Sequence, residues 1–439
     1  MSESSMRRRR PSSPELAAPL PDNDDILRGI LLRLPPLPSS LPRASLVCKR
    51  WRRLLSDPRF LRRFRAFHHR QAPLLGFFID YSGGTYFIPT LEPPDRIPSA
   101  RLSLDAPYHK AWSFLCCRHG LTLILNRTDL EIIVCDPITG DQRCFAIPPG
   151  FKRHDPRLVN CRGALLCDDH ASRVPLEAFK VVLLWTDGLQ LDTDPQMFAS
   201  FYESETGVWS NIISTSIKAH HWLGKPSILV KNSLYWLLHG FGNNGLIGVV
   251  ELDLDSKNLA VIDTPAHALS SFHAQILRME DSRLGLAISS ELSIQAWERK
   301  ANYEGGARWT LQKTIELDKL LPLGPDIVMG SWMSVKIYGY DEDGNAIIVS
   351  PGREFFMIQL KSLQFRKLFE STNITVYHPY KSFFTGVNSL SFTVSHCCNR
   401  FHMLKLETIN NTLFPCFIEA ILFLHIFTEF SERLCQGSA

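Results

Sequence analysis

The sequence predicts a small N-terminal bundle of three helices followed by an all-β domain built as a propeller of about six blades. The fold is therefore α+β in sequence order. Helical patterns are confined largely to residues 20–70, whereas short runs of β-branched and aromatic residues alternate with Gly, Pro, Asn and Asp after residue 73. At 439 residues the chain is long enough to bury a substantial core.

Three short helices are expected before residue 70. Asp22 and Asn23 can cap the first, Ser40 can cap the second, and Asp57 followed by Pro58 starts the third. The apolar residues at helical spacing are Ile26, Leu27, Ile30, Leu31 and Leu34 in the first helix, Ala44, Val47, Cys48, Trp51, Leu54 and Leu55 in the second, and Phe60, Leu61, Phe64 and Phe67 in the third.

Two short sequence units repeat after residue 73. The first is a small or polar residue followed by an apolar strand, as in GLTLIL (120–125), GALLC (163–167), SLYWLL (233–238), RLGLAI (283–288), NAIIV (345–349) and SLSFTV (389–394). The second is a pair of strands joined by a polar turn, at 134–149, 202–212, 251–265 and 359–368. First units recur at intervals of 43, 70, 50, 62 and 44 residues, which favours propeller blades over the alternative of two β-sandwiches.

These patterns divide the chain into five parts. Residues 1–15 form a disordered basic tail, 16–66 the helical bundle, 67–73 a linker, 74–410 the propeller-like domain and 411–439 an apolar C-terminal tail. The most apolar stretch, 413–427, is shorter than the roughly 20 residues that cross a bilayer, and it includes Glu419 and His425. A packed terminal segment is therefore expected there, and no membrane contact.

Charge is distributed unevenly along the chain. Residues 1–72 hold 16 Lys and Arg against 6 Asp and Glu, whereas the rest holds 32 against 38. The N-terminus has no apolar segment of the secretory kind, and the cysteine count is an odd 11. These features predict a protein of a reducing compartment, the nucleus and/or the cytoplasm.

No motif in the sequence identifies a catalytic or cofactor site. GFGNNG at 240–245 matches a dinucleotide-binding pattern, but a further strand follows it, which favours a hairpin turn. Cys161, Cys167 and His170 lack the second pair of ligands that zinc needs. The prediction is therefore no catalytic residue, no metal and no cofactor.

The basic head does not resemble a DNA reader, because the helix that includes Trp51 offers only Arg and Lys, which bind phosphates without reading bases. Its apolar residues are more numerous than so small a bundle can hide, which indicates a partner interface. They are Leu20, Pro21, Ile26, Leu27, Ile30, Leu34, Leu41, Leu46, Val47 and Trp51.

Residues 20–64 resemble an F-box. The resemblance rests on Leu20–Pro21, an acidic cap, an Ile/Leu helix, the run Val47-Cys-Lys-Arg-Trp51 and a Ser-Asp-Pro turn, although the loop PPLPSSLP is longer than usual. The body resembles the propeller-like, kelch-like associated domains of plant F-box proteins, especially those of grasses, in WSFLCCRHGLTLIL, VCDPITGDQR, FKVVLLW and YESETGVWS.

The resemblance implies a non-catalytic substrate-receptor subunit of a Skp–cullin–F-box ubiquitin ligase. The F-box would bind a Skp-family adaptor, and through it the cullin and RING subunits, while the propeller would bind a protein substrate, with 186–196 and 239–246 as candidate loops. The implied adaptor-binding residues are Leu20, Pro21, Ile26, Leu27, Ile30, Leu34, Leu46, Val47 and Trp51. A propeller enzyme with an incidental helical head and a nuclear nucleic-acid-binding protein are the alternatives.

Overall fold

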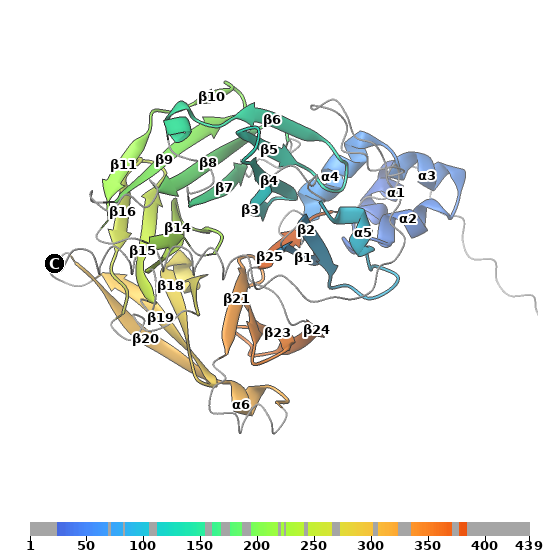
Figure 1. Cartoon of the computed structure of the whole chain (residues 1–439). Coiled ribbons are helices and arrows are strands. Elements are labelled where there is room, and N and C mark those ends of the chain that lie inside the picture. Colours follow the sequence, from blue (N-terminus) through green and yellow to red (C-terminus); the bar gives the residue numbers. More distant parts are fainter. Residues whose placement is uncertain are drawn as a thin grey trace, which may run out of the picture. The chain divides into compact units, whose positions relative to one another are not determined.

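The computed structural model describes residues 24–68, 72–81, 84–104, 112–153, 160–167, 176–186, 195–217, 221–223, 225–240, 245–265, 273–301, 306–323, 335–370 and 377–383. The chain forms two compact units (Figure 1). Of the described residues, the first unit holds those up to Pro73 together with Phe383, and the second holds the rest.

The first unit consists, within residues 24–68, of four short helices. They are α1 (Asp24–Leu31), α2 (Ser40–Ser45), α3 (Lys49–Leu55) and α4 (Pro58–His68). The segment predicted as one second helix is thus two helices, α2 and α3. The third predicted helix also runs to His68, two residues into the expected linker.

The break between α2 and α3 lies at Leu46–Cys48. Leu46 and Val47 donate to carbonyls three residues back, which is how helices commonly end, and Cys48 then adopts an extended backbone with φ of −161°. The Cys48 sulfur accepts the Trp51 N–H at 3.5 Å and so caps α3. Periodicity could not reveal this break, because the apolar stripe continues across it.

Apolar residues from all four helices and the α1–α2 loop fill the bundle core. It comprises Leu27, Leu31, Leu32, Leu41, Ala44, Leu54, Leu55, Phe60 and Phe64, with Leu34, Trp51, Leu61 and Phe383 packed against it. His68 closes one end, because its Nε2 lies 2.9 Å from the Leu32 carbonyl and its ring packs on Phe64. These residues fill the core, so the exposed apolar residues of the bundle are not needed for it.

The second unit contains, in its described residues, six antiparallel sheets that follow one another around a ring (Figure 1). Blade 1 is β25 (Tyr377–Lys381), β1 (Leu74–Tyr81) and β2 (Gly84–Pro89); blade 2 is β3 (Trp112–Arg118), β4 (Leu121–Asn126), β5 (Glu131–Cys135) and β6 (Gln142–Ala146). Blade 3 is β7 (Cys161–Cys167), β8 (Phe179–Thr186), β9 (Gln196–Glu203) and β10 (Val208–Trp209), with β11 (Ile213–Ser216) beside β9.

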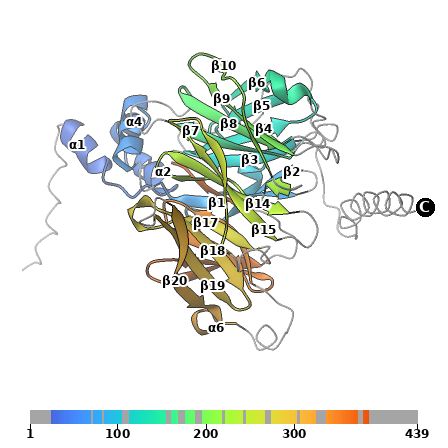
Figure 2. The same cartoon turned by 90° about the vertical axis from the view of Figure 1, so that its left-hand side faces the viewer.

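The remaining blades follow the same plan, and β18, β19 and β20 lie side by side in both views (Figures 1 and 2). Blade 4 is β12 (His221–Leu223), β13 (Ile228–Val230), β14 (Ser233–Gly240), β15 (Leu246–Asp253) and β16 (Leu259–Ile262). Blade 5 is β17 (Ala274–Arg278), β18 (Leu284–Ser290), β19 (Ser293–Ala301) and β20 (Ala307–Glu316). Blade 6 is β21 (Lys336–Asp341), β22 (Ala346–Ser350), β23 (Glu354–Gln359) and β24 (Phe365–Glu370); short helices α5 (Ser99–Leu102) and α6 (Leu317–Leu320) lie between strands.

The ring closes through blade 1, which combines strands from both ends of the domain. β25 pairs with β1, so that Phe77 lies opposite Pro379 and Phe78 opposite His378. β25 also contacts β3 of blade 2 and β21 of blade 6, and the Cys117 thiol donates to the Pro379 carbonyl at 3.1 Å. Pro379 fits there because β25 is an edge strand of its sheet, where a missing N–H is tolerated. The predicted propeller is confirmed, and the alternative of two sandwiches is excluded.

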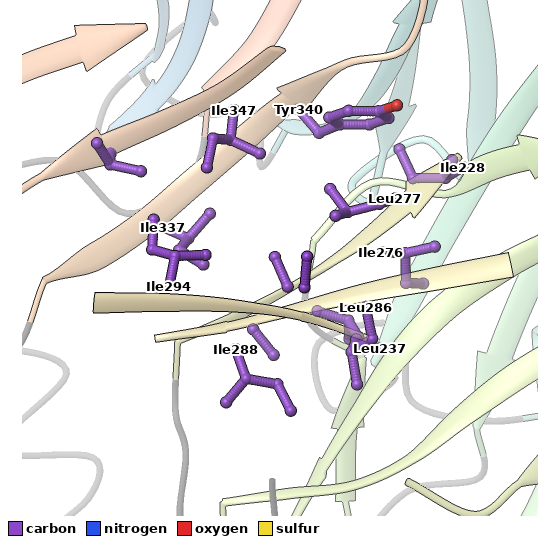
Figure 3. Close-up of a cluster of buried hydrophobic side chains, with 14 of the residues drawn as sticks. Ile228, Leu237, Ile276, Leu277, Leu286, Ile288, Ile294, Ile337, Tyr340 and Ile347 are labelled. Carbon is purple, nitrogen blue, oxygen red and sulfur yellow. The ribbon is translucent and has the colours of Figure 1, made fainter. Parts of the chain in front are cut away.

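The middle strands of the blades are buried on both faces, because each sheet packs between two others. Every residue of β4 and of β14 is buried, which explains why these strands read as continuous apolar runs rather than alternating ones. Figure 3 shows part of the largest cluster, where Leu237, Leu286 and Ile347 come from blades 4, 5 and 6. The last strands of blades 2, 5 and 6 are largely exposed, as outer edges of a propeller should be.

One ion pair links blades at the end of the ring where the inner strands finish. Arg118, the last residue of β3, pairs with Glu342, which directly follows β21. The same carboxylate accepts the Leu229 N–H at 3.3 Å, and Arg278 of β17 donates to the Glu342 carbonyl at 2.6 Å. A second pair, Lys381 with Asp341 at 2.8 Å, lies at the same end. Arg118, Arg278 and Lys381 thus each contact an oxygen of Asp341 or Glu342, at the end of β21 in blade 6.

Buried histidine makes the propeller sensitive to acid. His378 of β25 is 5% exposed with its ring centroid 4.6 Å from that of Phe114, and burial, followed by the charge of Arg162, lowers its pKa to about 3. The unfolded chain binds a proton near pH 6.5 and the folded one does not, so stability is lost as pH falls below 6.5. The slope for one such group is at most about 1.4 kcal/mol per pH unit.

His378→Phe keeps an aromatic ring beside Phe114 and removes this titration. We expect urea denaturation to show that the variant loses less stability than the wild-type protein between pH 7 and pH 5. Equal losses in the two proteins would contradict the assignment of acid sensitivity to His378.

Two predicted segments fall outside this description. SLSFTV at 389–394 and the tail 411–439, with its apolar stretch 413–427, lie beyond the described residues, so the predicted boundary at 410 stays a prediction. Among the helices that the structure does describe, none combines the length and the hydropathy needed to cross a bilayer.

Candidate adaptor-binding site

Helix α1 carries two apolar stripes on adjacent sides. Leu27 and Leu31 point into the bundle and are 1% and 0% exposed, whereas Ile26 and Ile30 are 51% and 42% exposed. Each pair is spaced by four residues, so each forms a stripe along one side of the helix. Only one stripe is needed for the core, and the other is available to a partner.

The turn between α2 and α3 supplies a second exposed apolar pair. Leu46 is 74% exposed and Val47 is 60% exposed, the two largest values among the exposed large apolar residues of the bundle. Both residues stand where α2 ends, before Cys48 starts α3. The helix break therefore directs these side chains outward, although the sequence placed Val47 on the core stripe.

An ion pair brings α1 close to this turn. Arg50 in the first turn of α3 bonds Asp24 at the start of α1, with both Nε and Nη2 at 2.8 Å from Oδ1. This hydrogen bond lowers the pKa of the Asp24 carboxyl. We name the four exposed apolar residues of α1 and of the turn, Ile26, Ile30, Leu46 and Val47, the apolar surface.

The structure describes seven of the nine predicted adaptor-binding residues. Four are exposed and form the apolar surface (Ile26, Ile30, Leu46 and Val47), Leu27 is core, and Leu34 and Trp51 are half-buried against the core. Leu20 and Pro21 lie outside the described residues. The roles of all nine in adaptor binding stay a prediction.

Two further exposed apolar residues were not predicted to lie at the surface. Leu37 stands between prolines in the α1–α2 loop and is 37% exposed, and Phe67 of α4 is 58% exposed. The exposure of Leu37 could have been predicted from the sequence, because this apolar residue lies in a proline-rich loop and on no helical stripe. Phe67 carries none, because it continues the spacing of Phe60 and Phe64.

The structure describes parts of the other candidate motifs. GFGNNG joins β14 to the antiparallel β15, which confirms the hairpin, and its residues 241–244 are outside the described part. Cys161 is buried in β7, and burial raises the pKa of its thiol to about 12. In the part of the chain that the structure describes, no group of three His, Cys, Asp or Glu residues could hold a metal ion. Most of the two candidate substrate loops, 187–194 and 241–244, is not described.

Comparison with protein families matches both units. Residues 23–63 match the F-box domain, and residues 113–381 match the family described as F-box protein AT5G49610-like, beta-propeller. The chain belongs to this family of F-box proteins. The match begins at β3 and ends with β25, so it includes the strand that closes the ring.

A curated relative of this F-box protein is the F-box/kelch-repeat protein At3g61590 of Arabidopsis thaliana. The two are 28% identical over 260 residues, which is 56% of this chain. The aligned region spans 57% of the length of that relative. The aligned part of this plant F-box/kelch-repeat protein is therefore related to this chain in sequence.

Two solved structures show low similarity to this chain. An oligogalacturonate lyase of Vibrio parahaemolyticus gives a TM-score of 0.35 at 11% identity, over 65% of this chain and 71% of that one. A mutant of AofleA from Arthrobotrys oligospora gives 0.34 at 13% identity, over 61% and 74%. Similarity at this level says nothing about activity.

Proposed function

We propose that this F-box protein is the substrate receptor of a Skp–cullin–F-box ubiquitin ligase. The F-box binds a Skp-family adaptor, and the propeller binds a protein substrate. The observation that carries the proposal is the apolar surface, four exposed side chains on a bundle whose core is already filled by others. Exposed apolar side chains gathered from two elements of a small domain are typical of a partner interface.

In this role the chain performs no bond chemistry of its own. The adaptor connects it to the cullin and to the RING subunit with its charged ubiquitin-conjugating enzyme. The receptor holds the substrate so that a lysine lies near the activated thioester, which accelerates transfer through proximity and orientation. A rigid propeller suits this task, because loops on a fixed frame can present specific side chains.

We place this function in the nucleus and/or the cytoplasm. Cys116, Cys135 and Cys161 are buried thiols rather than disulfides, which fits a reducing compartment. The run Arg7–Arg10 in the basic tail is a candidate import signal. Fluorescence imaging of the tagged protein, with and without these arginines, tests whether it is located in the nucleus.

Co-expression of the full chain with plant Skp-family adaptors tests the proposed function. We expect a stoichiometric complex in gel filtration that survives washing in high salt, because an apolar interface is little screened by ions. A folded chain that elutes alone with every adaptor of the plant's set would contradict the proposal.

A further inference from the structure

Helix α4 of the F-box, with the sequence PRFLRRFRAFH, carries four arginines and no acidic residue. Its buried residues are two phenylalanines and His68, whereas Arg59, Arg62 and Arg63 are exposed. Residues three or four apart are neighbours on the surface of a helix, so Arg59 lies beside both Arg62 and Arg63. We name these three residues the arginine face.

The bundle has too few acidic residues to pair with the arginine face. Residues 24–68 hold 11 Lys and Arg against 3 Asp and no Glu. Asp24 and Asp25 pair with arginines of α1 and α3. Asp57 caps α4, because its Oδ1 accepts the backbone N–H of Arg59 at 3.0 Å. Among the described residues, the arginine face therefore forms no ion pair.

This arrangement of charges costs helix stability. Like charges three or four residues apart repel one another, and Arg59 also lies in the first turn, at the positive end of the helix dipole. Solubility alone does not explain the arrangement, because alternating Glu and Arg would give a charged surface and would stabilise the helix as well. Guanidinium groups placed side by side at such a cost are suited to an anion supplied by a partner.

An exposed aromatic ring narrows the kind of partner. Phe67 is 58% exposed and follows Arg63 by four residues, so both side chains lie along one side of α4. This combination fits a peptide that offers carboxylates and one apolar side chain. Nucleic acid fits less well, because the arginine face has no Asn, Gln, Ser or Thr to read bases. Its three cations are also fewer than the roughly 6–10 phosphate contacts of a typical DNA-binding protein.

We propose that the arginine face and Phe67 bind an acidic peptide segment of a partner protein other than the adaptor. Carboxylates of the segment accept paired hydrogen bonds from the guanidinium groups, and an apolar side chain of the segment packs on Phe67. The surface proposed for the adaptor contains no residue of α4, so we assign the segment to a second partner. The inference goes beyond the proposed function, because binding of the acidic segment needs no adaptor.

A short labelled peptide tests this site in the full chain. The probe is Glu-Glu-Glu-Glu-Phe with both ends blocked, and its control is the same peptide with Gln in place of every Glu. Fluorescence anisotropy, at about 20 mM salt to limit screening, measures the binding of each peptide. We expect saturable binding of the acidic peptide alone, and we expect it to weaken as salt rises, because exposed ion pairs are screened.

Arg59→Glu and Arg308→Glu form a matched pair of variants. Arg308 is an exposed residue of β20 that lies opposite Lys300 of β19, so each substitution reverses one exposed charge beside another cation. Both variants should keep or raise the midpoint of thermal unfolding, followed by circular dichroism, because both remove a contact between like charges. We expect R59E to bind the acidic peptide about tenfold more weakly than the wild-type protein, and R308E to bind it equally well.

Four results would overturn the inference. The first is a lack of saturable binding, or equal binding of the acidic peptide and its Gln control. The second is equal affinity of R59E and R308E for the acidic peptide. The third is tighter binding of duplex DNA than of the peptide at the same site, which would make nucleic acid the partner. The fourth is displacement of the peptide by a bound adaptor, which would assign the arginine face to the adaptor interface.

The peptide titrations are made without adaptor, so they are independent of the proposed function. A chain that binds the acidic peptide but no adaptor refutes the proposed function alone. A chain that binds an adaptor but not the acidic peptide refutes this inference alone.

Discussion

Replacing Ile26 and Val47 by aspartate is expected to abolish adaptor binding without unfolding the F-box. Both side chains are more than half exposed, so their loss from the free protein changes its stability by about 0.5 kcal/mol or less each. In the complex the same positions would bury two unpaired carboxylates in an apolar interface. Anchors of this kind contribute about 2 kcal/mol or more each, so the double variant should weaken binding by roughly a thousandfold.

The matched control is the V208D/L311D double variant in the propeller. Val208 is 62% exposed and Leu311 is 47% exposed, close to the values of Val47 and Ile26. Isothermal titration of each variant with the adaptor gives the affinities, and circular dichroism shows that the folds are retained. If I26D/V47D binds the adaptor as tightly as the wild-type protein does, the apolar surface is not part of the adaptor interface. The same conclusion holds if the control variant loses as much affinity as I26D/V47D.

Glu342→Gln is expected to destabilise the propeller by about 3–5 kcal/mol, the cost of leaving a buried charge without its partner. The side chains of Arg118 and Glu342 are 14% and 21% exposed, so solvent compensates little for the lost carboxylate. The substitution keeps the shape and the hydrogen bond from the Leu229 N–H. The change therefore isolates the charge that links blade 2 to blade 6.

A double-mutant cycle with Arg118→Met separates pairing from packing. Because R118M removes the cation that E342Q leaves unpaired, the R118M/E342Q protein should lose less stability than the sum of the two single variants. Urea denaturation, monitored by propeller tryptophan fluorescence, gives the free energies of unfolding. Additive losses would show that the two residues stabilise the propeller independently.

The sequence predicted most of the propeller because blade strands carry a local signal. β4, β14, β18 and β22 correspond to the apolar units, and the strand pairs of blades 2, 3, 4 and 6 correspond to the second unit. GALLC is the exception: it belongs to β7, the inner strand of its blade rather than the second one. The ring closure could not be predicted, since β1 and β25 lie far apart in sequence and neither carries a mark of the other.

The candidate site was predicted only in outline. The excess of apolar residues in the bundle pointed to a partner surface, but periodicity could not separate the Ile26 face of α1 from the Leu27 face, because both are apolar. Leu46 and Val47 are exposed where α2 ends and before Cys48 starts α3, and the continuous apolar stripe gave no sign of that break.

Closure through β25 also sets the order of events during synthesis. β1 is complete at Tyr81, yet its partner begins at Tyr377, roughly 300 residues later. At about 5–20 residues per second, the ribosome needs on the order of 15–60 s to deliver that partner. For this time the inner edge of β1, with Phe77 and Phe78, has no strand to pair with. A nascent chain in this state is a natural client for chaperones that shield strand edges, and the yield of folded receptor should depend on their supply.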